Sequence, residues 1–177
     1  MKKLKLLLLT GFLVLSTCFP AFAGTWTHTH DTEWGTNTYD YLWFYVKDNG
    51  EYAQSEWVQD SDGTWYWIDD NQYLPTSQGV ADDGGLYNSK GAYIDFSDGS
   101  RKYLTKELSS QIANSMTYEQ VISILGKEHE VDSSSQSITS YGTYDYLTLK
   151  WYSKDAKGSQ YVAFTNGIVS YASSYWQ

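Results

Sequence analysis

Short runs of aromatic and aliphatic residues, each followed by a polar turn, mark the chain up to about residue 104. Trp43-Phe44-Tyr45-Val46 leads into Asp48-Asn49-Gly50, and Trp65-Tyr66-Trp67-Ile68 leads into Asp69-Asp70-Asn71. Runs of strand-forming residues that end in Asn, Asp and Gly are typical of strands followed by hairpin turns. The sequence therefore predicts consecutive antiparallel hairpins over residues 34–104.

The two runs are related by an internal repeat. When they are superimposed, Trp65 falls 22 residues after Trp43, and Asp70-Asn71 falls on Asp48-Asn49. A weaker third copy runs from Tyr87 to Tyr93. A unit of about 20 residues cannot bury its own hydrophobic face, so such units stack on one another. We expect residues 39–104 to form a solenoid-like module of β-hairpins.

A different pattern begins near Thr105. Residues 106–114 have helical composition behind Thr105, and Thr117-Tyr118-Glu119-Gln120 is a capping box that precedes an apolar helix face ending at Gly126. Strands are predicted over residues 144–152, 160–164 and 168–172, while the Ser- and Thr-rich residues 132–140 indicate a flexible loop. The expected fold class is mainly β plus α+β, with two helices against an antiparallel sheet over residues 105–177.

The aromatic region resembles a known family of repeats. The stretch from Leu42 to Tyr45, then Asn49 to Val58, then Gly63 to Ile68 resembles the cell-wall-binding (choline-binding, glucan-binding-like) repeats of Gram-positive surface proteins. That resemblance implies a wall polymer as partner, either choline-substituted teichoic acid or a glycan. It also implies aromatic cages shared by neighbouring hairpins.

Candidate ligand-binding rings follow from this resemblance and from the spacing. Trp57 and Trp65 flank the turn Asp60-Ser61-Asp62-Gly63, so a hairpin places them on neighbouring strands. A third ring is expected from Tyr66 or Trp67. A second, looser cage is expected from Trp34 and Trp43, with Tyr87 as its third ring. The full candidate set is Trp57, Trp65, Trp43, Trp34, Tyr66, Trp67 and Tyr87. The alternative is that the rings are only scaffold, as we expect of Phe44, Val46, Ile68 and Leu74.

The second region resembles the small α+β domain of the β-lactamase-inhibitor-protein-like and outer-membrane lipoprotein assembly families. The residues that carry this similarity are 112, 116–126, 146–151 and 162–169. Those families bind proteins through a sheet face and share no enzymatic site, so an extracytoplasmic protein partner is implied. An exposed aromatic face is predicted from Tyr144, Tyr146, Trp151, Tyr152 and Tyr161.

The N-terminus predicts export. Lysines at 2, 3 and 5 precede a largely apolar run of 14 residues (6–19) and Ala21-Phe22-Ala23, a pattern typical of a cleaved signal peptide over residues 1–23. The alternative is a lipid anchor at Cys18, the only cysteine. Residues 24–38 are expected to be a polar N-terminal segment. The whole chain carries a formal charge of −9, and loss of three lysines would make it −12, which disfavours nucleic acid as a partner.

Candidate chemistry is sparse. The chain contains none of the common serine- or metallo-hydrolase motifs, so we expect no enzymatic activity, no cofactor and no metal site. Residues 60–63 and 82–85 are interpreted as turns, because their glycines come too early for a calcium loop. The sequence therefore predicts a secreted or wall-associated, non-catalytic surface protein with a ligand-binding and a partner-binding part. The alternative is a secreted interaction or inhibitor protein with scaffold repeats.

Overall fold

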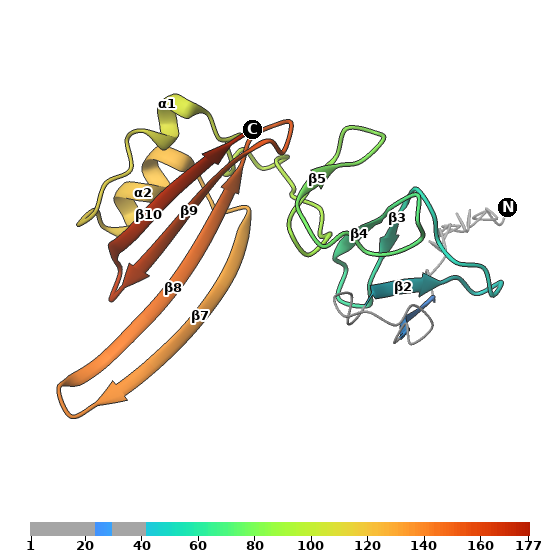
Figure 1. Ribbon diagram of the computed structural model, residues 1–177, viewed down its shortest axis with the longest axis horizontal. Helices are drawn as coiled ribbons and strands as arrows, with labels where there is room; N and C mark the ends of the chain where they lie inside the picture. Colours follow the sequence, from blue (N-terminus) through green and yellow to red (C-terminus); the bar gives the residue numbers. More distant parts are fainter. Residues whose placement is uncertain (1–23, 30–41) are drawn as a thin grey trace, which may run out of the picture.

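The computed structural model describes residues 24–29 and 42–177, which form mostly β-strands arranged in small antiparallel sheets (Figure 1). Within these residues, three two-stranded sheets precede one four-stranded sheet that is accompanied by two helices. The mainly β class is therefore confirmed. The predicted signal segment 1–23, with Cys18, and the candidate ring Trp34 lie outside the described residues.

The first part contains three strand pairs in the order of the chain. They are β1 (Thr25–Thr29) with β2 (Leu42–Val46), β3 (Glu56–Gln59) with β4 (Trp65–Ile68), and β5 (Gly79–Val80) with β6 (Leu86–Tyr87). Residues 24–38 are expected to be a polar tail, yet their described part forms β1. Trp26 explains this difference, because its ring packs edge-on against Tyr45 at 5.1 Å and Tyr66 at 5.4 Å.

Five turns in this part have the same hydrogen bonds. In each, the first residue's N–H donates to the carbonyl four residues later, and the fourth residue's N–H donates to the first residue's carbonyl. The fourth residue has a positive φ of 71° to 87°, a conformation that glycine adopts without strain. These turns begin at Lys47, Asp60, Asp69, Ala81 and Asn88. They include every turn predicted above for the aromatic region.

The small core of the first part follows from strand alternation. Val58, Ile68 and Tyr45 are buried together with Ala53, and Leu74 packs against them. Ile68 and Leu74 thus have the expected structural role. In β2, however, the buried side chain is Tyr45, and its neighbours Phe44 and Val46 point to the other face because successive strand residues alternate.

The second part packs helices on one face of a sheet. The helices are α1 (Lys106–Ser109) and α2 (Tyr118–Leu125), and the sheet order is β10-β9-β8-β7. Its strands are β7 (Glu130–Thr139), β8 (Gly142–Tyr152), β9 (Gly158–Thr165) and β10 (Ile168–Trp176). Val121 and Leu125 of α2 are buried against Trp151, Val162 and Phe164 of the sheet.

Local capping signals define the helix ends. The Thr105 hydroxyl accepts from the Leu108 N–H, and Thr117 and Gln120 form the predicted capping box. The helix predicted over residues 106–114 is nevertheless too long. After Ser109 the backbone hydrogen bonds change from the α-helical spacing of four residues to a spacing of three, because the N–H groups of Gln111 and Ile112 donate to carbonyls three residues back. The α-helix therefore ends at Ser109.

The loop predicted over residues 132–140 is wrong. Residues 130–139 form β7, an edge strand that pairs antiparallel with β8 along most of its length (Figure 1). The backbone of β7 is hydrogen-bonded to β8, and most side chains of β7 are exposed. Serine and threonine can therefore occupy this strand without the alternation of apolar and polar residues that marks a half-buried strand. The far end of this hairpin projects beyond β9, whose pairing with β8 starts at Tyr146.

A buried carboxylate joins the two parts. The Glu130 side chain, only 2% exposed, accepts from the Ser89 N–H at 3.1 Å, the Ser89 hydroxyl at 2.7 Å and the Tyr152 hydroxyl at 2.5 Å. Leu86 and Ile94 are buried against the Tyr152 ring. Because unpaired buried charge is costly, these three donors hold the turn at Asn88 against the end of the large sheet.

Candidate functional site

A pocket of about 510 Å³ opens between the second and third strand pairs. It combines aromatic faces, one carboxylate and two glycines, and no lysine, arginine or histidine lines it. The lining residues are Trp57, Trp65, Asp83, Gly84, Gly85 and Tyr93. Three of the six are aromatic, so the pocket has the composition of a ring cage with one acidic wall.

The β3–β4 register places the two tryptophans. Trp57 lies opposite Trp67, and Gln59 lies opposite Trp65, so Trp57 and Trp65 are diagonal neighbours on one face. The other face carries Val58, which packs into the core. The prediction that a hairpin brings Trp57 and Trp65 onto neighbouring strands is therefore confirmed.

Tyr93 supplies the third ring of the pocket. Its N–H donates to the Trp65 carbonyl at 2.8 Å, and its ring lies edge-on to Trp57 with centroids 5.3 Å apart. The Tyr93 side chain is 44% exposed and that of Trp65 is 37% exposed, so both rings are open to solvent. Sequence reasoning missed Tyr93, although it follows its turn at the position that Tyr52 occupies after the turn at Lys47.

Two rings expected to complete this cage do not line it. Tyr66 points to the opposite face of β4, where it packs with Trp26. Trp67 is on the correct face but is buried behind Trp57, with centroids 5.3 Å apart. Trp67 thus supports the position of the Trp57 ring and has no open face of its own.

The turn 81–85 contributes the acidic wall and the floor. The Asp83 carboxylate accepts from the Gly85 N–H at 2.9 Å through Oδ1 and from the Trp57 Nε1–H at 2.9 Å through Oδ2. A Cβ at Gly85 would lie 2.8 Å from Cζ2 of Trp57 and 3.4 Å from the Tyr93 ring. Glycine is therefore required at position 85 for the two rings to close around the pocket.

Burial and nearby carboxylates shift the pKa of two tyrosines in this region. Partial burial raises the pKa of the Tyr66 hydroxyl, and the negative charges of Asp62 and Asp60 raise it as well. Burial also raises the pKa of Tyr87, with contributions from Asp69 and Asp82. Negative charge opposes phenolate formation, so these carboxylates add to the effect of burial on the pKa of Tyr66 and Tyr87, neither of which lines the pocket.

The proposed second cage has no counterpart among the described residues. Trp43 is 43% exposed and packs edge-on against His28 at 5.0 Å, outside the pocket. Tyr87 is partly buried with its ring centroid 6.4 Å from that of Trp57, and it does not line the pocket. Both rings lie apart from the three that the structure brings together.

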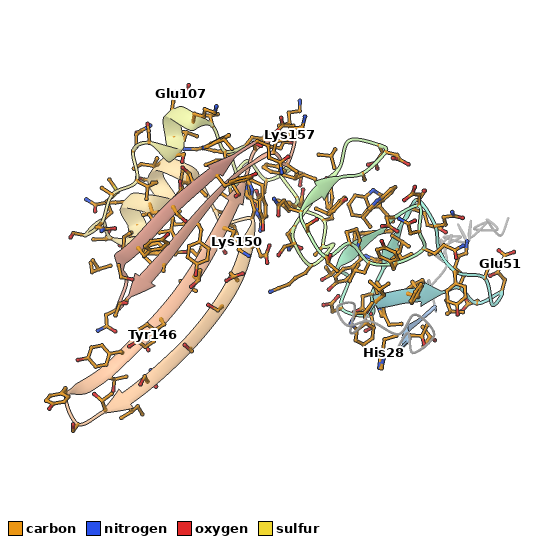
Figure 2. The ribbon with its side chains drawn as sticks, in the orientation of Figure 1. His28, Glu51, Glu107, Tyr146, Lys150 and Lys157 are labelled. Atoms are coloured by element: carbon orange, nitrogen blue, oxygen red, sulfur yellow. The ribbon has the colours of Figure 1, made fainter. Side chains whose placement is uncertain are left out.

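The open face of the large sheet carries a second aromatic surface. Tyr144, Tyr146 and Tyr161 share it by strand register, and Tyr146 and Lys150 lie along the same strand (Figure 2). Tyr171 and Tyr175, 57% and 60% exposed, lie on this face of β10 and were missed from the sequence. We call these five tyrosines the tyrosine face.

Two predicted members of an exposed aromatic face are buried. Trp151 is 0% exposed on the helix-facing side of β8, and Tyr152 is 1% exposed beneath Leu86 and Ile94. The expectation that they contact a partner is therefore wrong. Trp151 fills the helix–sheet core, and Tyr152 seals the contact between the two parts.

The described residues 24–29 and 42–177 show two further absences. They contain no helix long and apolar enough to cross a membrane. They also contain no group of three or more His, Cys, Asp or Glu side chains placed to hold a metal ion.

No protein-family model matches the chain, and no curated protein matches it.

Proposed function

We propose that this chain is an exported, non-catalytic surface protein that binds the quaternary ammonium groups of a cell-wall polymer. The observation that carries the proposal is that Trp57, Trp65, Tyr93 and Asp83 line the same pocket. A choline-substituted teichoic acid is the polymer whose chemistry fits that pocket best. The predicted signal segment and the resemblance to wall-binding repeats support the same assignment.

Cation chemistry explains why rings are the right partners. A trimethylammonium group has no N–H to donate, so it is held by the negative faces of aromatic rings, each contact contributing about 0.5–2 kcal/mol. Two or three such contacts give useful affinity when the ligand repeats along a polymer, because several weak contacts then act together. The Asp83 carboxylate adds attraction for the positive charge.

We also propose that residues 39–104 are stacked hairpin repeats. The turn at Asp69 follows the turn at Lys47 by 22 residues, and the turn at Ala81 follows the turn at Asp60 by 21. This spacing is close to the 22-residue repeat of the sequence. It supports a solenoid-like arrangement in which each cage is built between neighbouring units.

Replacing Trp65 with alanine tests the cage. This variant removes one of three rings, so we expect choline affinity to fall by about 5–30-fold, the equivalent of about 1–2 kcal/mol. Tryptophan fluorescence during a choline titration measures the affinity. Trp43→Ala is the matched control, because Trp43 is a similarly exposed tryptophan outside the pocket. The same pair of variants applied to purified cell walls measures retention on the natural polymer.

Three results would contradict the choline assignment. Loss of affinity in Trp43→Ala and not in Trp65→Ala would show that the ligand binds elsewhere. A response to a wall glycan without a response to choline would make the rings a sugar-stacking surface. Indifference to both ligands would leave the aromatic residues as scaffold, which is the alternative function.

The tyrosine face supports a second, partner-binding role for residues 105–177. Tyrosine offers large amphipathic contact area with few rotatable bonds, and it is enriched where proteins recognise proteins. Lys150 is the one charged side chain among the sheet positions of this face in β8, β9 and β10, and it pairs with Asp132. A tyrosine-rich face whose one charged side chain is paired suits a protein partner better than a polyelectrolyte.

A photo-crosslinking amino acid at position 146 tests this role in cells that export the protein. We expect one discrete adduct from position 146, because Tyr146 is 42% exposed within the tyrosine face. Position 123 on α2 is the control, since Ser123 is exposed on the other side of the sheet. Equal adducts from both positions, or none from 146, would contradict a partner on this face.

A further inference from the structure

We propose that Asp83 makes the pocket disfavour a quaternary ammonium group whose carboxylate is only one carbon from the nitrogen. The pocket would then accept choline and reject glycine betaine, although both present the same trimethylammonium head. This inference rests on the proposed function, because it concerns the ligand class of the same pocket. It goes further by assigning discrimination to one carboxylate.

The carboxylate is fixed in place by the fold. The Gly85 N–H donates to Oδ1 and the Trp57 indole N–H donates to Oδ2, both at 2.9 Å, so neither oxygen is free to rotate away from the pocket wall. Asp83 is the only acidic residue among those that line the pocket. Its charge is therefore held beside the ring faces before any ligand arrives.

No positive side chain compensates for this charge inside the pocket. The lining contains no lysine, arginine or histidine, so the field inside the pocket is set by the charge of Asp83. A ligand's cation is attracted by this field, whereas an anion attached to the same ligand is repelled by it. In betaine the carboxylate is one carbon from the ammonium, so the two effects oppose each other at the same site. In choline that position holds a neutral hydroxymethyl group.

Asp83 also positions a ring of the cage. Trp57 contacts Trp67 and Tyr93 edge-on, and its indole N–H donates a hydrogen bond to Asp83. An asparagine at position 83 keeps an acceptor oxygen and the shape of the side chain while removing the charge. Because Asp83 uses both oxygens as acceptors, Asp83→Asn can keep the hydrogen bond from the Trp57 indole only by giving up the one from Gly85, so the position of the indole in this variant is measured separately.

The experiment compares choline with glycine betaine on the full protein by fluorescence titration. For the unmodified protein we expect choline to bind at least about fivefold more tightly than betaine, the scale of an exposed charge–charge interaction. In Asp83→Asn we expect the two affinities to agree within about twofold, through weaker choline binding and stronger betaine binding. Asp82→Asn is the matched control, because Asp82 lies in the same turn but does not line the pocket. It should keep the preference of the unmodified protein.

Two further measurements test the position of the indole and the role of the charge. Near-ultraviolet circular dichroism of Asp83→Asn should match the unmodified protein if the indole stays in place. Raising the sodium chloride concentration should weaken choline binding more in the unmodified protein than in Asp83→Asn, because salt screens the carboxylate.

The failure of this inference differs from the failure of the proposed function. Equal binding of choline and betaine by the unmodified protein, or an unchanged preference in Asp83→Asn, would overturn the selectivity role and leave the cage standing. Absence of binding by both ligands, with no effect of Trp65→Ala, would overturn the cage itself and the selectivity role with it.

Discussion

Replacing Trp151 with alanine is expected to lower the free energy of unfolding of residues 105–177 by about 3–5 kcal/mol. Trp151 is the largest fully buried side chain of the helix–sheet core, with 0% exposure. Its indole N–H also donates to the carbonyl of Gly126 at 3.1 Å, directly after α2. Alanine would leave both a cavity and an unpaired buried carbonyl. Chemical denaturation followed by circular dichroism measures the loss.

Trp151→Phe separates the two contributions. Phenylalanine keeps an aromatic ring in the core but cannot donate to Gly126, so it should cost clearly less than alanine. A loss below about 1 kcal/mol for Trp151→Ala would contradict the placement of this side chain in the core, since truncations of buried rings cost more than that.

Stability is also expected to fall on acidification because of His129. The His129 side chain is buried. Its Nδ1 accepts a hydrogen bond from the Tyr152 backbone N–H at 2.9 Å, and its Nε2 lies 3.0 Å from the Lys102 carbonyl oxygen. Since Nδ1 accepts, the proton of the neutral ring lies on Nε2 and is donated to Lys102. A second proton at Nδ1 would break the bond to Tyr152.

Burial lowers the pKa of His129 from 6.5 to about 4, and the Arg101 charge contributes in the same direction against the opposing bond to Lys102. Between these two values the unfolded chain binds a proton that the native chain does not, so the free energy of unfolding falls as the pH falls. The stabilisation is complete above pH 6.5 and is lost by about pH 4. Its full size is about 3 kcal/mol, at about 1.4 kcal/mol for each pH unit.

Denaturation at a series of pH values tests this expectation. His129→Gln removes the titrating group, so its free energy of unfolding should change less than that of the unmodified protein between pH 6.5 and 4. An identical pH profile for the two proteins would show that His129 does not govern the acid response.

Local signals in the sequence predicted local structure well. The turns at Asp60, Asp69 and Asn88 were predictable because Asp, Asn and Gly satisfy a tight turn within a few residues. The capping box at Thr117 was predictable for the same reason, since its bonds join residues three positions apart. The neighbouring positions of Trp57 and Trp65 followed from one such turn.

Features that depend on distant pairing were not predictable in the same way. Residues 132–140 indicated a loop because a serine-rich edge strand has no apolar alternation, and only its pairing with β8 reveals it. Tyr93 joins the pocket through a bond to Trp65 across 28 positions of the chain, which no local pattern encodes. The burial of Tyr152 was not predictable either. It depends on Leu86 and Ile94, which belong to the first part of the chain and pack against Tyr152 in the second.

A crystal structure of the protein grown with excess choline tests the central proposal most directly. We predict density for a trimethylammonium group in the pocket, with its nitrogen within about 6 Å of the ring centroids of Trp57, Trp65 and Tyr93. The Asp83 carboxylate should remain bonded to Trp57 and Gly85 beside it. Choline bound at another surface, or a pocket occupied only by water under these conditions, would contradict the assignment of this pocket as a quaternary ammonium site.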